Sequence, residues 1–355
     1  MRWLDRQYNR ENPMNILVFS FCRLGDSLVM LPMLHLLRDN YPHARILLLS
    51  QAEETGQFVG ARAILEGRGL VDDFLSFPVE GGWLKRHGMR LKLAWQLRRH
   101  GVEIGIVGIP AAPPLEKALL RNMVLFLRMA GARQILAPSS ILQGEHLPKA
   151  ADELLGLLSP LGVEIPCMDC GNFTLPKRED YAREADKFTR KFPKGRVLVA
   201  MAVGGNRSSQ RWPLERFEEL ARRLSDAGGY LVLFGGPGDV EAMERVRGKF
   251  EGTIVTATVG VSAEVLRRCS FYVGNDTGVM HLAVSVGLKC VCIFSARNPP
   301  GVWEPYGTDH AILLPHPPCE GCLCMACPLS TPCILTHTVA DVWEACQPFF
   351  KQQGK

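Results

Sequence analysis

The fold of this chain is decided by one stretch of sequence, Gly274-Asn275-Asp276-Thr277-Gly278-Val279-Met280-His281. The apolar run at residues 271–273 before it predicts a buried strand, and residues 279–286 predict a short helix that ends at Gly287. The stretch is therefore a turn that leads from a strand into a helix, with Asp276 or Thr277 as the helix cap.

The same turn has the features of an anion site. The first backbone N–H groups of a helix have no partner within the helix, and they attract negative charge. Gly278 allows a ligand to approach the backbone, and Thr277 and His281, four residues apart, share one helix face. Taken alone, these residues also fit an ordinary capped helix with a packed histidine, so the rest of the chain has to distinguish the two interpretations.

The length and composition indicate a globular protein of two domains. A chain of 355 residues suits two domains of about 150 to 180 residues each. It contains no apolar stretch long enough to cross a membrane, and residues 1–13 mix Arg with acidic residues and lack the apolar core of a signal peptide. We therefore expect a cytoplasmic protein, whose 12 cysteines are thiols or metal ligands rather than disulfides.

Positive charge is concentrated in residues 81–133. This segment holds ten Lys and Arg against Glu103 and Glu116, a net charge of +8, so the remainder of a chain with net charge +5 is at −3. Such a surface favours a phosphorylated acceptor or an anionic membrane, although it also fits an ordinary solvated helix face. A nucleic-acid partner is not expected, because few aromatic residues alternate with these charges.

The first half alternates strands and helices. Residues 15–19 predict a strand, the loop at 20–27 follows, and residues 28–38 predict a helix kinked at Pro32 before a strand at 46–49. This βαβ unit places Asp26 at a helix tip beside the carboxyl end of a strand, where doubly wound proteins bind ligands. The alternation continues with helices at 83–100, 115–130 and 148–161 and strands at 102–109 and 134–137.

Prolines and a charged run interrupt the pattern between residues 165 and 195, which predicts a domain boundary. The second half restarts with a strand at 196–201, the loop 203–213 and a helix that ends at Ala227. Later elements are strands at 230–234 and 290–294 and a helix that Ser262 caps and that ends near Cys269. Two α/β domains of this kind predict two parallel sheets facing a cleft, and the absence of Gly-x-Gly-x-x-Gly disfavours a dinucleotide dehydrogenase.

The motifs together resemble those of glycosyltransferase family 9, the ADP-heptose:lipopolysaccharide heptosyltransferases. The resemblance covers residues 14–333 and is carried by four stretches: Arg23-Leu24-Gly25-Asp26-Ser27-Leu28, Arg211-Trp212-Pro213 with Arg216-Phe217, the 274–281 turn, and Trp303-Glu304-Pro305-Tyr306-Gly307. It implies the GT-B fold, with two Rossmann-like parallel-sheet domains facing a central cleft. Residues 14–176 would bind the acceptor, residues 177–337 the nucleotide-sugar donor, and a helix within 338–355 would cross back to the first domain.

The resemblance assigns Asp26 as the catalytic general base. At a helix N-terminus its carboxylate would be held ionised, which makes it a weak base. The competing interpretation is a simple helix cap. The resemblance also implies acceptor contacts, for which Arg23, Lys85, Arg86 and Arg90 are the candidates.

Donor binding is implied for a second set of residues. Without a metal motif near the turn, helix N–H groups and basic side chains would balance the diphosphate charge. Many family members carry a Lys at the position of Gln210, which puts the usual donor in question. The expected donor-site residues are Arg207, Gln210, Arg211, Asp276, Thr277, Gly278 and His281.

The cysteines at positions 319, 322, 324, 327 and 333 form a cluster with paired C-x2-C spacing. A structural zinc at Cys319, Cys322, Cys327 and Cys333 is one hypothesis, but the spacing between the pairs is shorter than usual. We therefore expect no cofactor and no metal in catalysis.

The resulting prediction is an inverting, metal-independent transferase that moves a heptose from ADP-heptose onto a lipopolysaccharide-core or related cell-envelope acceptor. It would work in the cytoplasm, in contact with the anionic inner membrane. Two alternatives remain: a GT-B sugar-nucleotide epimerase or hydrolase, and a non-catalytic protein that binds nucleotide sugars.

Overall fold

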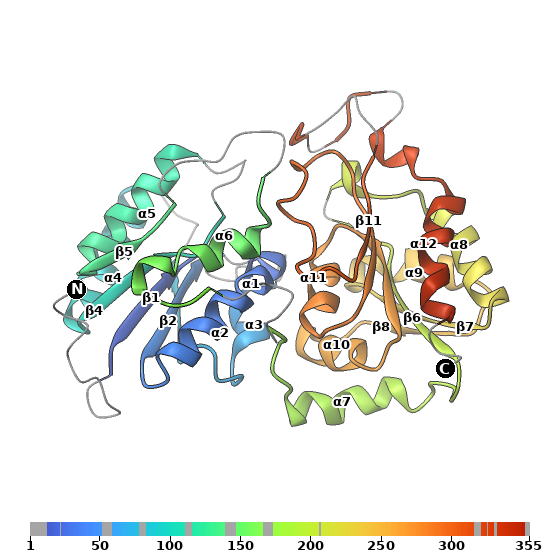
Figure 1. Cartoon of the computed structure of the whole chain (residues 1–355), viewed down its shortest axis with the longest axis horizontal. Coiled ribbons are helices and arrows are strands. Elements are labelled where there is room, and N and C mark those ends of the chain that lie inside the picture. Colours follow the sequence, from blue (N-terminus) through green and yellow to red (C-terminus); the bar gives the residue numbers. More distant parts are fainter. Residues whose placement is uncertain are drawn as a thin grey trace. The chain divides into compact units, whose positions relative to one another are not determined.

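The computed structural model of the chain is shown in Figure 1. It describes residues 13–21, 23–51, 59–77, 83–110, 116–138, 147–165, 173–205, 207–315, 321–324, 326–329 and 332–351. The chain forms two compact units, the first of residues 1–143 and 150–173 and the second of residues 144–149 and 174–355. No helix within the described residues is long and apolar enough to cross a membrane.

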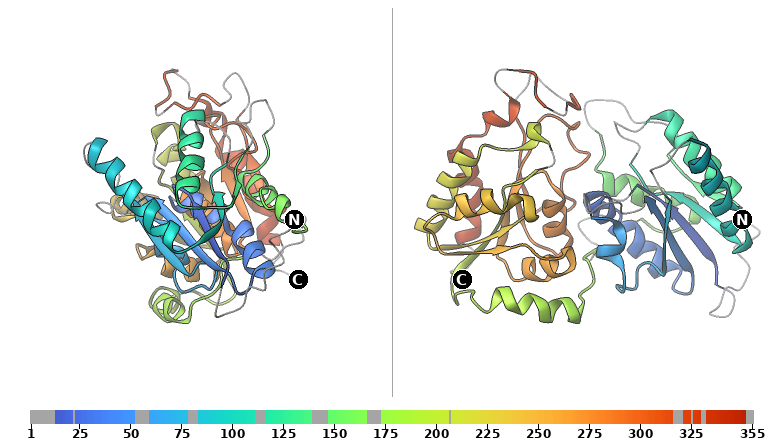
Figure 2. Two further views of the ribbon diagram at one scale, coloured as in Figure 1. Left: turned by 90° about the vertical axis from the view of Figure 1, so that its left-hand side faces the viewer. Right: turned by 180° about the vertical axis from the view of Figure 1, so that it is seen from behind.

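The first unit is built on a parallel sheet of five strands. Their order is β3 (Asp73–Phe77), β2 (Arg45–Gln51), β1 (Asn15–Phe19), β4 (Val102–Val107) and β5 (Gln134–Leu136). Helices α4 (Trp83–Arg99) and α5 (Lys117–Met129) pack against each other and bury one face of the sheet. Helices α2 (Leu31–Asn40) and α6 (Ala150–Gly156), which also contact each other, cover the other face (Figures 1 and 2).

The helix after β1 differs from the prediction. It is divided at Met30 into α1 (Leu24–Val29) and α2, and Pro32 lies in the first turn of α2, where its missing N–H group is tolerated. Because α1 begins at Leu24, Asp26 lies inside its first turn and not in the preceding loop.

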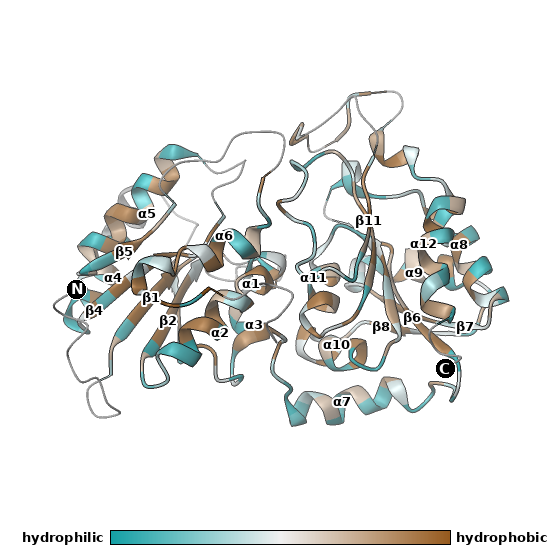
Figure 3. Ribbon diagram, viewed as in Figure 1, coloured by the Kyte–Doolittle hydropathy of each residue, from teal (hydrophilic) through white to brown (hydrophobic). Residues whose placement is uncertain are grey.

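The second unit contains a parallel sheet of six strands. Their order is β11 (Ala311–Leu313), β10 (Cys290–Ile293), β9 (Phe271–Asn275), β6 (Val197–Ala202), β7 (Gly229–Phe234) and β8 (Gly252–Val255). Figure 3 shows the strands of both units mostly in the brown of hydrophobic residues, as expected for parallel sheets that are covered on both faces.

Three helices share one core with this sheet: α8 (Leu214–Asp226), α9 (Val240–Arg247) and α12 (Val339–Lys351). The C-terminal helix was predicted to cross back to the first domain, but the structure places it in the second unit. Helix α12 belongs to the second unit, where Val342 and Cys346 are fully buried and Phe349 stacks on Phe271 at 4.9 Å. The apolar side of the helix is thus buried against the six-stranded sheet.

The remaining helices of the second unit include one that the sequence did not predict. Helix α7 (Glu179–Thr189) lies in the charged segment between residues 165 and 195 that was predicted to be a domain boundary without regular structure. It packs against α10 (Val259–Leu266). A Cβ atom at Gly260 would lie 2.3 Å from the Tyr181 ring, so the contact requires glycine. Thr258, and not Ser262, caps α10, because its hydroxyl accepts from the Val261 N–H group.

Candidate functional site

The functional residues of the second unit lie where its strand order reverses. Strands β6 and β9 are neighbours, with Ala202 opposite Gly274, and the chain leaves them toward opposite sides of the sheet. In open parallel sheets this switch point, at the carboxyl ends of the strands, is where ligands bind. It brings together the loop after β6 and the turn between β9 and α11 (Gly278–Ser285).

Asn275, the last residue of β9, fixes the loop that follows β6. Its side chain is fully buried and makes three hydrogen bonds. Its Oδ1 atom accepts from the Trp212 backbone N–H (3.1 Å), and its Nδ2 atom donates to the carbonyls of Val203 (3.2 Å) and Gly204 (3.0 Å). No role was predicted for Asn275, although its place at the end of an apolar strand was a usable signal.

Asp276 is the centre of a polar network. Its Oδ2 atom accepts hydrogen bonds from Gln210 Nε2 (2.9 Å) and from Asn298 Nδ2 (3.1 Å). Burial raises the pKa of Asp276 to about 6, against the lowering effect of these two hydrogen bonds and of the charges on Arg297 and Arg207. Gln210 thus occupies the expected lysine position with a neutral amide that bonds to this carboxylate.

Arg297, which follows β10, brings positive charge to this network. Its side chain is buried, and its guanidinium donates to Asn298 Oδ1 (2.7 Å) and to the carbonyls of Cys324 (3.0 Å) and Leu323 (3.2 Å). Ser209 Oγ donates to the same Cys324 carbonyl (3.0 Å). Part of the cysteine-rich segment is therefore fastened to the site by its backbone carbonyls.

Neither Arg297 nor Asn298 was predicted as a site residue. They lie four and five residues after the end of β10, on the loop that leaves the carboxyl end of this strand. That position was the only signal available for them.

Helix α11 begins without a side-chain cap. Thr277 occupies the cap position, as predicted, but its hydroxyl makes no capping hydrogen bond. Its Oγ atom is buried and makes no hydrogen bond of regular geometry among the described residues, although it lies near enough to the Tyr272 hydroxyl to lower the pKa of that group against the larger, raising effect of burial. The Tyr272 hydroxyl donates to the Asn275 carbonyl (3.4 Å). An uncapped helix start beside a buried hydroxyl is a suitable place for an anion.

His281 does not join this polar group. Its side chain is 4% exposed and lies edge-on to the Trp303 ring, with 6.3 Å between the ring centroids. Burial lowers the pKa of His281 to about 4, so the imidazole is neutral near pH 7. These observations fit the packed histidine that was the alternative interpretation.

Of the two predicted donor-site arginines, one lies in this network and the other does not. Arg207 donates to Gln210 Oε1 (3.5 Å) and therefore lies in the network. Arg211 is exposed, and its Nε atom donates to the Gly205 carbonyl (2.7 Å). Trp212 is buried and donates from its indole to the His337 carbonyl (2.9 Å), so this part of the motif is structural.

In the first unit, Asp26 lies just beyond the carboxyl end of β1, beside the point where the strand order reverses between β1 and β4. Its Oδ2 atom accepts from the Arg23 backbone N–H (3.0 Å), which is a capping interaction within α1. Burial raises the pKa of Asp26, and the Arg23 N–H and the Arg23 charge lower it less. The helix start alone favours a lower pKa, but the pKa of Asp26 is shifted upward because burial has the larger effect.

The acceptor candidates are only partly described. Arg23 is exposed at the start of α1, and Arg90 of α4 lies over the Phe77 ring, 5.7 Å from its centroid. Lys85 and Arg86 belong to α4, but their side chains lie outside the described residues. No common acceptor site is assigned to them here.

The cysteine cluster is described in part as well. Cys333 Sγ accepts from the Ala296 backbone N–H (3.2 Å), and Cys322 is exposed. Within the described portion of the chain, no three His, Cys, Asp or Glu residues are grouped to hold a metal ion. Cys319 lies outside that portion, so the zinc hypothesis stays a prediction.

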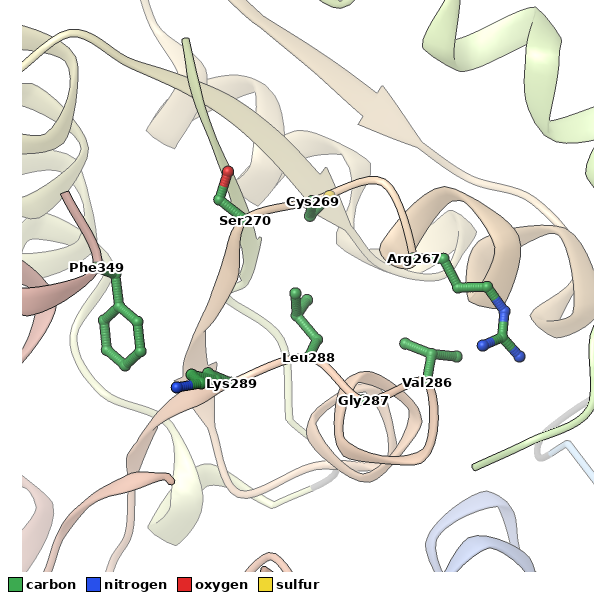
Figure 4. A pocket seen from close by; sticks show the side chains of 8 residues that line it. All are labelled: Arg267, Cys269, Ser270, Val286, Gly287, Leu288, Lys289 and Phe349. Carbon is green, nitrogen blue, oxygen red and sulfur yellow. The ribbon is translucent and has the colours of Figure 1, made fainter. Parts of the chain in front are cut away.

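A pocket of about 300 Å³ lies at the opposite end of β9 from Asp276 (Figure 4). Its two cationic side chains are already paired, Arg267 with Glu264 (3.0 Å) and Lys289 with Asp309 (3.0 Å). It is therefore a poor candidate for the functional site. The residues that line it are Arg267, Cys269, Ser270, Val286, Gly287, Leu288, Lys289 and Phe349.

Comparison with known proteins identifies the family. The sequence profile of glycosyltransferase family 9 (heptosyltransferase) matches residues 132–331, which is more than half of the chain. The chain belongs to glycosyltransferase family 9. This family 9 protein is therefore a glycosyltransferase, and the predicted family and enzyme class are confirmed.

Individual relatives are distant but cover most of the chain. Lipopolysaccharide heptosyltransferase 2 of Escherichia coli is 23% identical over 303 residues, which are 81% of this chain and 84% of the relative. The crystal structure of a glycosyl transferase family 9 protein from Veillonella parvula superposes with a TM-score of 0.75 at 20% identity, covering 96% of this chain and 98% of that one.

The structure of E. coli ADP-heptose lps heptosyltransferase II gives a TM-score of 0.68 at 18% identity, covering 96% of this family 9 enzyme and all of that chain. These similarities confirm the predicted GT-B fold of two parallel-sheet α/β domains.

Proposed function

We propose that this family 9 enzyme transfers a heptose from ADP-heptose to a saccharide of the lipopolysaccharide core, with inversion at the anomeric carbon. The observation that carries the proposal is the uncapped start of α11 beside the buried Thr277 hydroxyl and the Asp276 network. The names of the relatives, a lipopolysaccharide heptosyltransferase and an ADP-heptose lps heptosyltransferase, support the choice of sugar and acceptor.

In this proposal the second unit holds the donor. The diphosphate lies against the first N–H groups of α11, and the buried Thr277 hydroxyl, which makes no capping hydrogen bond, donates to a phosphate oxygen. Arg207 and Arg297 supply the positive charge that a lysine at position 210 provides in many relatives. Both arginines act on Asp276 electrostatically, so both lie near enough to influence an anion there.

Asp276 would order the turn rather than bind phosphate, because two negative groups repel. Its hydrogen bonds to Gln210 and Asn298 connect the loops that follow β6 and β10 to the start of α11. The network thereby holds the helix N–H groups in place for the donor. A pre-ordered site avoids reorganisation when the leaving group becomes negatively charged.

The first unit would bind the acceptor and supply the base. The acceptor hydroxyl oxygen attacks the anomeric carbon of the donor while the bond from this carbon to the diphosphate oxygen breaks. Asp26 accepts the hydroxyl proton, and ADP leaves with the bonding electrons. Because burial raises the pKa of Asp26, it is a better base than an exposed aspartate.

The proposal is tested by incubating the purified chain with ADP-heptose and lipopolysaccharide that lacks heptose, and following the acceptor by mass spectrometry. We expect the mass of one heptose to be added to the acceptor, with release of ADP. Consumption of ADP-heptose at the same rate without acceptor would instead indicate a hydrolase or an epimerase.

The nucleotide is tested separately by thermal shift with ADP-, UDP-, GDP- and CDP-sugars, since a bound donor stabilises the folded state. The proposal predicts the largest rise in melting temperature with ADP-heptose. A rise with another nucleotide sugar alone would contradict the proposed donor.

A further inference from the structure

Helices α4 and α5 of the first unit carry exposed apolar side chains. Their inner sides are buried in the core, for example Leu97 of α4 and Leu127 of α5. Of the six large apolar side chains exposed among the described residues, three lie on these two helices. They are Leu91 (57% exposed), Trp95 (57%) and Leu125 (53%). We call the outer side of the two helices the α4–α5 surface.

The exposed apolar and basic residues share helix faces. On α4, Leu91, Trp95 and Arg99 follow one another at intervals of four residues, which places them in one row. The Arg99 guanidinium lies over the Trp95 ring, 4.5 Å from its centroid. On α5, Arg121, Leu125 and Arg128 form the same kind of row, and all three are exposed.

The charge of the α4–α5 surface has one sign. The two helices contain nine Lys and Arg residues and no Asp or Glu. Of the nearest acidic residues in sequence, Glu103 is buried and accepts from the Asn15 N–H (2.8 Å), and Glu116 is exposed at the N-cap position of α5, outside both helices. Neither charge of a single sign nor an exposed tryptophan is needed for the stability of a solvent-facing helix, so both features indicate a binding surface.

We propose that the α4–α5 surface binds the anionic surface of a lipid bilayer. Both helices lie along the interface, with Leu91, Trp95 and Leu125 among the headgroups and the basic side chains on lipid phosphates. Basic residues alternating with Trp and Leu on a surface helix are the combination that suits this interface. A free phosphorylated saccharide would pair with the charges but would leave the three apolar side chains in water.

This proposal does not rest on the identity of the donor sugar. If the acceptor is linked to a lipid, this contact places the first unit at the membrane surface that holds the acceptor. Removing a basic residue from such a surface weakens partitioning about fivefold.

Co-sedimentation of the whole protein with vesicles tests the proposal, using phosphatidylcholine alone and phosphatidylcholine with phosphatidylglycerol. We expect binding only to the anionic vesicles. The double variant Arg98→Gln/Arg99→Gln should weaken it about 25-fold, and Trp95→Ser/Leu125→Ser should weaken it while leaving the melting temperature close to that of the wild type.

The matched control is Arg183→Gln/Lys187→Gln, which removes the same charge from exposed positions on α7. It should bind vesicles as the wild type does. Equal binding to both vesicle types, or an equal loss in the control, would overturn the proposal. Binding of soluble polyglutamate without binding to vesicles would also overturn it, in favour of an acidic polypeptide.

Discussion

Replacing Asp276 with asparagine should make the protein more stable near pH 8. Burial raises the pKa of this carboxyl from its ordinary 3.8 to about 6. A carboxyl whose pKa is higher in the folded than in the unfolded state stabilises the folded protein most below pH 4, where it is protonated in both states. This stabilisation is lost as the pH rises from 4 through 6, because the folded protein must then carry a buried charge.

The magnitude follows from the difference in pKa. At about 1.4 kcal/mol for each pKa unit, the rise corresponds to a loss of up to about 3 kcal/mol in the free energy of unfolding between pH 4 and pH 8. The side-chain amide introduced by Asp276→Asn would keep an oxygen for Gln210 and Asn298 and would lack the charge. We therefore expect the variant to exceed the wild type by about 1 to 3 kcal/mol at pH 8 and to match it near pH 4.

Urea unfolding at pH 4.5, 6 and 8 measures this difference, with the transition of the second unit followed separately from that of the first. The matched control is Asp226→Asn, whose carboxylate is 61% exposed on α8. A difference between variant and wild type that does not change with pH would refute the reasoning, as would a variant that is less stable than the wild type at pH 8.

Three further substitutions test the same site. Asn275→Ala removes the partner of three backbone groups, two of them buried, so urea unfolding should show a loss of about 3 to 5 kcal/mol. A loss below about 1 kcal/mol would contradict the assigned hydrogen bonds. Thr277→Val removes a hydroxyl that does not cap α11, so calorimetry should show about tenfold weaker donor binding (~1.4 kcal/mol) with little change in stability. Unchanged affinity would show that the hydroxyl is not part of the donor site. Gln210→Lys puts a positive charge beside Asp276 and lowers the pKa of its carboxyl, so the loss of stability that urea unfolding shows between pH 4 and pH 8 should become smaller. An undiminished loss would contradict the contact between residue 210 and Asp276.

Most of the fold could be predicted because central parallel strands are short apolar runs. Residues 230–234 and 271–273 are examples, and both strands are fully buried. Edge strands carry a weaker signal. The edge strands β3, β8 and β11 are only partly buried and were not predicted, whereas β5, at the other edge of the first sheet, was. Helix α7 was missed for a related reason, since Ala185 is its only fully buried residue and charged residues dominate its sequence.

The candidate site could be predicted only where a motif marked it. The turn after β9 and the position of Gln210 were found, but their hydrogen bond joins residues 66 positions apart and depends on the pairing of β6 with β9. Arg297 comes from a third loop, the one after β10, and it lies near Asp276 only because β10 pairs with β9. The upward shift in the pKa of Asp26 was not predicted because sequence shows a helix start but does not show how deeply it is buried.

The proposed function rests most directly on Asp26 as the base. Transfer of heptose and binding of ADP-heptose should be measured together for the wild type, for Asp26→Asn and for the exposed control Asp39→Asn on α2. We predict that Asp26→Asn lowers turnover at least about 100-fold while the donor Kd stays the same, and that Asp39→Asn changes neither. Unchanged turnover in Asp26→Asn would contradict the proposed mechanism.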